Sequence, residues 1–368
     1  MTDPLASVRP EVRKLKAYHL DLSPTTHKLD QNEVPYELPA PLKRRVADVL
    51  TRRPWGRYPD FHSNDLRRAL GRHYDWPMEG VLVGSGAGEL IEATLTTFVE
   101  PNTEVLGTRP SFSLYNMLLT RVSARPRFFF SGDDLKLPLE ELTRAVDENP
   151  DIPVLLCSPN NPTGDTAPVD VLDDLLGRLR APLFLDCAYA DFAEENYRPL
   201  LDKHRHLVMF FTFSKAWSLA GLRLGYLLAD PAVTEEISKV KRPYNVNFLT
   251  AAVGEALLVD NAAAKRRVRV LMGRRPQWSE MLREAGLRVY PSQANFVLAR
   301  HPKAPEIGRA LDQRGIRVRV LGGHEILAEC LRFSVGNGIA LRATRAALQE
   351  IMHEITEEIT EEVTEEIG

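Results

Sequence analysis

A lysine close behind an apolar run is the most informative residue of this sequence. Lys215 follows the run VMFFTF at 208–213, and burial of an ammonium group is costly and lowers its pKa. A lysine of lowered pKa is the kind that forms an imine with a carbonyl compound. Thr212, Ser214 and Arg223 lie near it in the sequence, and hydroxyl groups together with a guanidinium suit a phosphate. Taken alone, the lysine could equally be a surface residue at a strand end.

A glycine-rich segment offers a second place for an anion. The run VLV at 81–83 leads into GSGAG at 84–88, and a helical pattern extends from about Ala87 to Phe98. Glycines let a ligand approach the backbone, and the N–H groups of a helix N-terminus bind anions. The segment is not a Walker A loop, and Glu89 stands where the third glycine of a dinucleotide-binding loop would be. A plain tight turn is the alternative.

Four further residues are suited to a planar ligand beside that lysine. Asp186 ends the apolar run LFLD, and a buried carboxylate needs a positive partner such as a pyridinium N–H. The phenol of Tyr189 and the amide of Asn161 can hydrogen-bond a ring oxygen. Phe112 can stack on a ring or pack in a core. With Lys215, these features describe the binding of a phosphorylated pyridine aldehyde, pyridoxal 5′-phosphate.

Alternating short apolar runs and helical patterns must position these residues. The runs are short enough to predict strands buried on both faces, and they lie at 81–83, 104–107, 127–130, 154–157, 183–186, 208–213 and 225–229. Strands that alternate with helices predict an α/β fold with a mainly parallel sheet. The chemical residues follow the strands, at the edge where α/β folds bind ligands.

The flanking segments differ from this alternation. Residues 1–40 are rich in proline and predict an arm rather than a core element, packed on the small domain or on a partner subunit. A large cofactor-binding domain is expected over 41–240. A linker helix and a smaller α+β domain are expected over 241–352, with strands near 287–291, 295–299, 315–320 and 331–335.

The last segment, 353–368, repeats Ile/Val-Thr-Glu-Glu and carries seven acidic residues but no lysine or arginine. Apolar residues at every fourth position could form a narrow helical stripe. A solvated, frayed helix end without a catalytic role is the expected reading.

Composition excludes several classes of protein. The 368 residues include 47 Lys+Arg and 50 Asp+Glu, and the net charge of −3 gives no reason to expect a nucleic-acid partner. The absence of a long apolar run, and of a signal-like N-terminus, predicts a cytoplasmic protein without a membrane span. Cys157, Cys187 and Cys330 are too scattered for a disulfide framework or a zinc site, so no metal is expected and they are expected to be buried thiols.

Three motifs resemble those of the fold-type-I (class II) pyridoxal-phosphate aminotransferases: SPNNPTG at 158–164, LDCAYADF at 185–192 and TFSKAWSLAGLRLGY at 212–226. Within them the chain is most similar to the histidinol-phosphate aminotransferases. Supporting segments are LDQNEVPYELP at 29–39, GRYPD at 56–60, GAGELI at 86–91, QANFVL at 293–298, GIRVRV at 315–320 and CLRFSVG at 330–336. The resemblance covers nearly all of the chain except the acidic tail. It implies a seven-stranded, mainly parallel sheet between helices in a large domain, and a smaller α+β domain.

The resemblance also implies roles for the residues around the cofactor ring. Lys215 would hold pyridoxal phosphate covalently and later shuttle a proton. Asp186 would pair with the pyridine nitrogen, and Asn161 and Tyr189 would bond the ring oxygen. Phe112 would stack on the ring.

A second set would bind the phosphate and the substrate. The expected phosphate residues are Ala87, Gly88, Thr212, Ser214 and Arg223, with Tyr58 reaching in from the partner of a homodimer. Arg332 would clamp the substrate carboxylate. The residues expected to recognise histidinol phosphate, or to close the site over it, are Tyr18, Asn32, Tyr58 and Arg319.

Three positions depart from the family pattern. Gly88 stands where the family has Asp or Asn, Cys187 replaces a glutamate, and Phe112 replaces a tyrosine. The implied reaction interconverts L-histidinol phosphate and 2-oxoglutarate with imidazole-acetol phosphate and L-glutamate. The alternatives are an aromatic amino-acid aminotransferase, a threonine-phosphate decarboxylase and a cofactor-binding module without catalysis.

Overall fold

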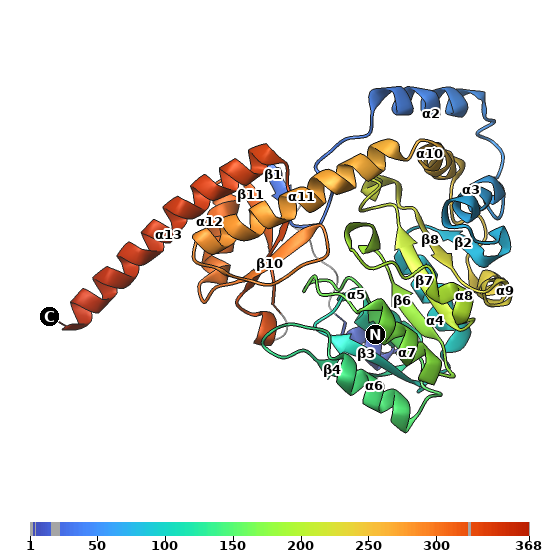
Figure 1. Ribbon diagram of the computed structural model, residues 1–368, viewed down its shortest axis with the longest axis horizontal. Coiled ribbons are helices and arrows are strands. Elements are labelled where there is room, and N and C mark those ends of the chain that lie inside the picture. The colour runs from blue at the N-terminus through green and yellow to red at the C-terminus, as the bar shows by residue number, and fades with distance from the viewer. Residues whose placement is uncertain (1–2, 4, 16–22, 323–324, 368) are drawn as a thin grey trace.

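A computed structural model describes residue 3 and residues 5–15, 23–322 and 325–367, with side chains as far as residue 357. The larger of its two sheets has the order β2-β8-β7-β6-β5-β3-β4 (Figure 1). The strands are β2 Val81–Gly84, β3 Glu104–Arg109, β4 Arg125–Phe130, β5 Val154–Cys157, β6 Leu183–Asp186, β7 Leu207–Thr212 and β8 Gly225–Leu228. Only β8 runs antiparallel to its neighbours. The expected α/β fold with a mainly parallel seven-stranded sheet is confirmed.

Helices cover both faces of this sheet, because successive strand residues are apolar on both sides. Phe184 and Phe210 pack with α4 and α5, whereas Leu185 and Met209 belong to a second cluster on the opposite face. The helices around the sheet are α2 Ala40–Arg52, α3 Asn64–Tyr74, α4 Ala87–Phe98, α5 Leu114–Arg121, α6 Leu139–Glu148, α7 Val169–Arg178, α8 Leu200–Lys203, α9 Pro231–Val240 and α10 Phe248–Val259.

The expectation of burial on both faces is wrong for β4. This strand is at the edge of the sheet and pairs only with β3, so most of its residues are partly or fully exposed. Arginines cover two of its rings: the Arg109 guanidinium lies 4.1 Å from the centre of Phe128, and that of Arg127 lies 5.3 Å from the centre of Phe129. A cation over an aromatic face lets these rings remain near water.

The smaller sheet has five strands, in the order β1-β11-β12-β10-β9. Its strands are β1 His27–Leu29, β9 Arg288–Val289, β10 Phe296–Arg300, β11 Ile316–Val320 and β12 Cys330–Ser334. Its helices are α11 Ala262–Glu284, which reaches from α10 to β9 and β10, α12 Ala304–Gln313 and α13 Gly338–Ile367 (Figure 1). This sheet and its helices form the α+β part that the sequence predicts.

Residues 27–32 correct the expectation that the first forty residues hold no core element. The strand β1 pairs in parallel with β11, and Leu29, Asp30 and Asn32 are buried. Pairing across almost 300 positions leaves no local signal in the sequence. Farther toward the N-terminus, α1 (Pro10–Arg13) lies beside α5, where Arg9 donates to the carbonyl of Thr120.

The segment 131–137, which follows β4 of the larger sheet, packs against the smaller sheet. Leu135 is buried among Tyr290, Leu298 and neighbours of the smaller sheet. Asp133 forms ion pairs with Arg288 and Arg300. The position of the smaller sheet relative to the larger one is therefore supported by both apolar and ionic contacts.

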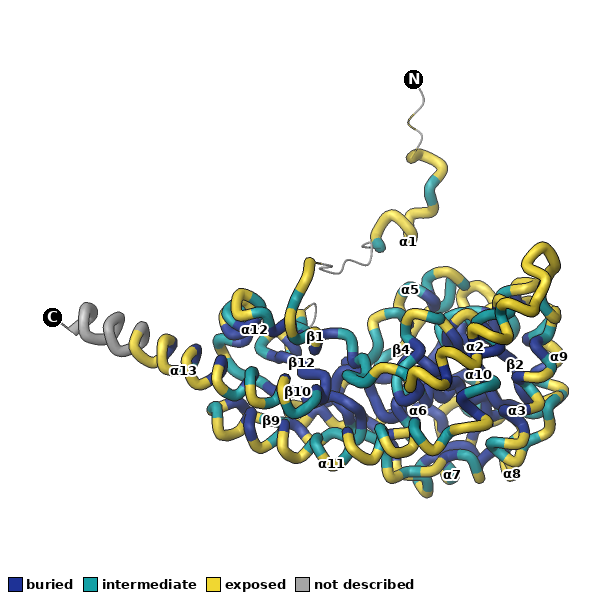
Figure 2. The backbone as a smooth tube through the Cα atoms, turned by 90° about the horizontal axis from the view of Figure 1, so that it is seen from above, coloured by how far each residue is buried: buried dark blue, intermediate teal, exposed yellow. Residues whose placement is uncertain are grey.

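The acidic tail continues α13 without a break to Ile367, and Figure 2 shows this helix extending from the body of the molecule. No helix in the described residues is long and apolar enough to cross a membrane. The three cysteines are buried free thiols, as expected.

Candidate active site at the carboxyl edge of the large sheet

Lys215 lies in the turn after β7, at the edge where the parallel strands end. Its Nζ donates a hydrogen bond to the carbonyl oxygen of Gln31, at 2.7 Å. Burial is the main cause that lowers the pKa of Lys215, to about 7, and the nearby Arg332 guanidinium adds to it. A large share of this lysine is therefore a neutral amine near neutral pH, which is the nucleophilic form.

Asp186 ends β6 on the same edge and is only 3% exposed. Its Oδ2 accepts from the Tyr115 hydroxyl at 2.6 Å, and its Oδ1 accepts from the Ala188 N–H at 3.0 Å. Within the described residues no lysine, arginine or histidine pairs with it, and burial raises its pKa. A buried carboxylate with only neutral donors fits a ligand that brings its own positively charged N–H.

Asn161 and Tyr189 each have a polar side-chain partner among the described residues. The Asn161 amide oxygen accepts from the Arg332 guanidinium. The Tyr189 hydroxyl accepts from the Asn32 amide at 2.9 Å, and burial raises the pKa of Tyr189 to about 12. This phenol remains protonated at neutral pH and can donate a hydrogen bond to a ligand oxygen.

Thr212, Ser214 and Arg223 form a polar group beside the N-terminus of α4. Arg223 donates to the Ser214 hydroxyl at 3.2 Å, and the Ser214 N–H donates to the Thr212 hydroxyl at 3.1 Å. The residue before α4 is Gly86, which has no side chain to cap the helix that begins at Ala87. Hydroxyls, a guanidinium and helix N–H groups together suit a phosphate.

Two glycines allow the N-terminus of α4 to lie close to β8 and to Arg223. A Cβ on Gly225, the first residue of β8, would lie 2.3 Å from the Ala87 nitrogen, so any side chain there would displace α4. Gly86 has φ +86°, and a Cβ on it would lie 3.0 Å from the Arg223 Nη2. The close approach of Arg223 to the backbone at Gly86 therefore depends on glycine.

Gly88 lies against Leu114. A Cβ on Gly88 would lie 3.1 Å from a methyl group of Leu114, so the Asp or Asn expected from the family pattern would need Leu114 to move. Phe112 is half-buried, and its ring meets that of Tyr115 edge-on with the centroids 5.6 Å apart.

Arg332 and Arg319 face each other across two strands of the smaller sheet. They are paired in the register of β12 and β11, so their side chains lie on the same face. Arg332 is buried and also donates to the Asp30 carbonyl at 2.7 Å. The Arg319 guanidinium forms no hydrogen bond or ion pair with the residues that the structure describes. Like charges placed directly opposite are unfavourable, and an anion between them offsets that cost.

Asn32 is buried, with φ +55° and its own N–H donating to Ser334 at 2.8 Å. It therefore joins the N-terminal segment to β12 as well as to Tyr189. Tyr58, by contrast, is not brought to the site within one chain: it is 81% exposed, and its ring stacks on that of Tyr244. Tyr18 lies outside the described residues.

The sequence reading missed two contacts of this site. Tyr115 lies three positions after Phe112, about one helical turn. This spacing could have indicated that the Tyr115 hydroxyl lies near the site. The contact of Gln31 with Lys215 uses a backbone carbonyl, for which the sequence carries no signal.

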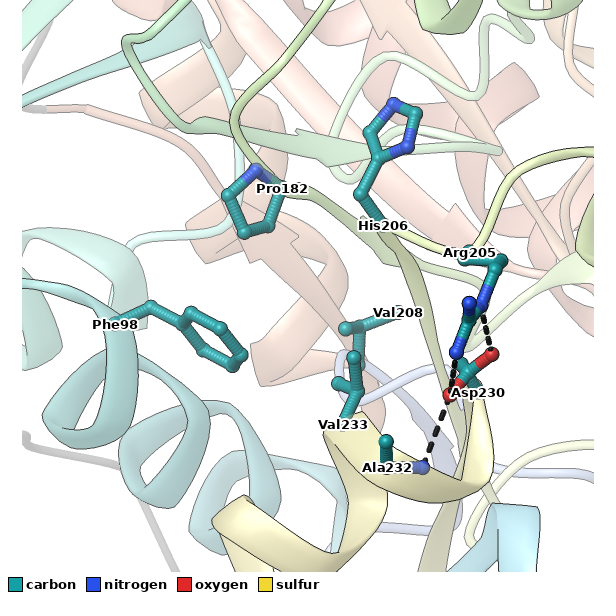
Figure 3. Close-up of a pocket in the computed structure, with 8 residues that line it drawn as sticks. All are labelled: Phe98, Pro182, Arg205, His206, Val208, Asp230, Ala232 and Val233. Atoms are coloured by element: carbon teal, nitrogen blue, oxygen red, sulfur yellow. Dashed lines mark hydrogen bonds and ion pairs between the residues drawn. The ribbon is translucent and has the colours of Figure 1, made fainter.

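A pocket of about 320 Å³ lies at the opposite, amino edge of the sheet (Figure 3). Phe98, Val208 and Val233 line it, and Arg205 pairs with Asp230 at 2.7 Å beside it. A second hollow, of about 780 Å³, lies beside α6 and Phe130. Neither contains a residue of the candidate site.

Comparisons with known proteins show the family of the chain. The family model for aminotransferases of class I and II matches residues 25–351. Histidinol-phosphate aminotransferase 1 of Carboxydothermus hydrogenoformans is 35% identical over 92% of this chain and 97% of its own length.

Two solved structures share the fold. Histidinol-phosphate aminotransferase from Sinorhizobium meliloti, in complex with pyridoxal-5′-phosphate, has a TM-score of 0.85 at 23% identity and covers 95% of this chain and 98% of its own. L-threonine-O-3-phosphate decarboxylase from Porphyromonas gingivalis has a TM-score of 0.76 at 22% identity and covers 88% of this chain and 99% of its own. By its sequence and its fold, the chain belongs to the aminotransferases of class I and II.

Proposed function

We propose that the protein uses pyridoxal 5′-phosphate to move an amino group between L-histidinol phosphate and 2-oxoglutarate, with imidazole-acetol phosphate and L-glutamate as products. The observation that carries this proposal is that Lys215 and Asp186 lie at the same edge of the large sheet. Lys215 has a lowered pKa, and the buried carboxylate of Asp186 has no cationic partner among the described residues. The name of the curated relative supports the choice of substrate.

The residues of this edge fit the proposed cofactor. Asp186 matches the ring nitrogen by charge, and Asn161 and Tyr189 match the ring oxygen by their hydrogen-bonding groups. Phe112 supplies a stacking surface. The phosphate would be held by the N-terminus of α4 at Ala87 and Gly88, and by Thr212, Ser214 and Arg223. When bound, pyridoxal phosphate supplies an electron sink for charge that develops on the substrate carbon.

Lys215 would carry the proton during the reaction. A general acid–base catalyst works best when its pKa is near the working pH, and the pKa of Lys215 is about 7. Its Nζ would therefore be able to take a proton from the substrate carbon and to release it again. Lys215 is only partly exposed, and its surroundings restrict water, which would otherwise compete for that proton.

Arg319 and Arg332 would recognise the anionic groups of both substrates. A guanidinium pairs with phosphate or carboxylate through two parallel hydrogen bonds. Two of them on one face of the smaller sheet suit a phosphate in one half-reaction and a dicarboxylate in the other. Asn32 would add contacts at the same place. Tyr18, expected to recognise histidinol phosphate or to close the site, lies outside the described residues.

A second copy of the chain would complete the site. Tyr58 is exposed beside other exposed aromatic side chains, Trp55, Phe61 and Tyr244. Rings of this kind are typical of interface cores. The proposed unit is a homodimer in which Tyr58 reaches the partner's phosphate.

The domain boundaries near 40, 240 and 352, and the cytoplasmic location, stay predictions.

The test is a single-turnover titration of the cofactor-loaded protein with histidinol phosphate, without any oxo acid. At low substrate concentration, a complete change of the absorbance to that of the aminated cofactor would support the proposal. Conversion by an aromatic amino acid alone would transfer the assignment to an aromatic amino-acid aminotransferase. Release of carbon dioxide from phosphothreonine would favour the decarboxylase, whose fold is shared. A cofactor that responds to none of them would indicate a binding module.

A further inference from the structure

The Asp186 carboxylate is held by two neutral donors on separate elements. The Ala188 N–H belongs to the turn after β6, and it fixes Oδ1 at 3.0 Å. The Tyr115 hydroxyl comes from the first turn of α5, 71 positions away, and fixes Oδ2 at 2.6 Å. Of the two donors, only Tyr115 contributes a side chain, so it alone can be removed by substitution.

Tyr115 is itself held firmly. It is 4% exposed, within the cluster that α4 and α5 form against β5, β6 and β7. Its ring supports Phe112 edge-on, with an angle of 86° between the rings. One side chain therefore contacts both the carboxylate expected under the ring nitrogen and the aromatic ring expected on the cofactor face.

Two opposing effects act on the Asp186 carboxyl. Burial raises its pKa, whereas the hydrogen bond from Tyr115 lowers it. The other titratable groups around it are Cys157, Cys187 and Tyr189, and burial raises the pKa of each. These groups are neutral at physiological pH, so the Tyr115 hydroxyl is the side-chain donor that favours the charged form.

We propose that Tyr115 is a positioning residue: it holds Asp186 ionised and oriented toward the cofactor's ring nitrogen, and it supports Phe112 on the ring face. The inference rests on the proposed function, because it assumes that pyridoxal phosphate binds at this edge. It adds a residue that acts on the cofactor only through Asp186 and Phe112.

The first test uses the protein without cofactor. Tyr115→Phe keeps the ring and removes only the hydroxyl, and Tyr197→Phe is the matched control. Tyr197 is equally buried, but its hydroxyl bonds Ser158 and Ala167 instead. At pH 8, urea unfolding should show that Tyr115→Phe raises the unfolding constant roughly tenfold or more, the value typical of a hydrogen bond to a charged group. In the Asp186→Asn background this effect should fall to a few-fold.

The second test uses pyridoxal phosphate itself. Tyr115→Phe should weaken its binding roughly tenfold and shift the pH titration of its absorbance by about one unit, because one pKa unit equals a tenfold change in affinity. Tyr197→Phe should change neither. Asp186→Asn should show both effects already, and adding Tyr115→Phe to it should change little.

The outcomes separate this inference from the proposed function. If Tyr115→Phe behaves like Tyr197→Phe in affinity and in titration, the positioning role is overturned. A wild-type protein that binds pyridoxal phosphate but does not react with histidinol phosphate overturns the substrate alone, and the Tyr115 comparison is still made. A wild-type protein that does not bind pyridoxal phosphate overturns both.

Discussion

Two aspartates at opposite edges of the seven-stranded sheet have opposite environments. Asp186 ends β6 at the carboxyl edge, where burial raises its pKa and the donors are neutral. Asp230 follows β8, whose reversed direction places it at the amino edge beside the pocket of Figure 3. There the hydrogen bond from Arg205 lowers the pKa of Asp230.

The difference separates residues that stabilise the fold from residues that await a ligand. Asp230 is satisfied within the chain, because it pairs with Arg205 and its carboxylate also caps α9 through the Ala232 N–H at 2.9 Å. Asp186 is buried and Lys215 is partly buried, and neither forms an ion pair with the residues that the structure describes. Such local conflicts are expected at functional sites.

The largest effect is expected at the lysine. Lys215→Ala should reduce transamination by at least about 10³-fold, because it removes both the nucleophile and the proton carrier. Lys239→Ala, at an exposed lysine of α9, should leave the rate unchanged. Single-turnover absorbance measures both variants, and substantial residual turnover in Lys215→Ala would contradict the assigned mechanism.

The same substitution, Asp to Asn, should affect turnover strongly at one edge of the sheet and hardly at the other. Asp186→Asn should lower turnover by about 10²-fold or more, since the charge opposite the ring nitrogen is lost. Asp230→Asn should leave turnover within about twofold. Steady-state rates of the two variants test this prediction. Equal losses of activity would contradict the distinction between the two edges.

A smaller effect is expected at the proposed interface. Tyr58→Phe should weaken retention of pyridoxal phosphate roughly tenfold, the lower end of the value of one hydrogen bond to a charged group. Equilibrium dialysis of the loaded protein measures it. Tyr244→Phe keeps the stacked ring beside Tyr58 and is the control; unchanged retention in Tyr58→Phe would show that the phosphate contact is wrongly assigned.

The last prediction concerns stability rather than activity, and it is a pH dependence of the cofactor-free protein. The pKa of Lys215 is lowered on folding from 10.5 to about 7, so between these values the unfolded chain binds more protons. The free energy of unfolding should therefore gain a contribution that rises with pH through this window and is absent below about pH 7. Urea unfolding of the wild type and of Lys215→Met at a series of pH values tests this. Parallel curves would contradict a buried, destabilised ammonium.

Much of this site could be predicted because its residues follow directly on strands. Asp186, Asn161 and Lys215 each come within a few residues of an apolar run, and the parallel order brings those ends together. The contact of Asn32 with Tyr189 spans 157 positions, and that of Lys215 with Gln31 spans 184. Local patterns carry no information about such pairings. The aromatic run of β4 resembles a central strand, and only the order of the sheet places it at the edge.

The cross-strand pairing of Arg319 with Arg332 makes the proposed anion site a property of backbone register. Side chains alternate between the faces of a strand, so a shift of one residue would turn Arg332 to the other side of the sheet. Inserting or deleting one residue at the start of β12 would therefore remove substrate recognition although Arg319 and Arg332 both remained in the chain. In an evolving lineage, gain and loss of this specificity would follow length changes near β12 more closely than substitutions within it.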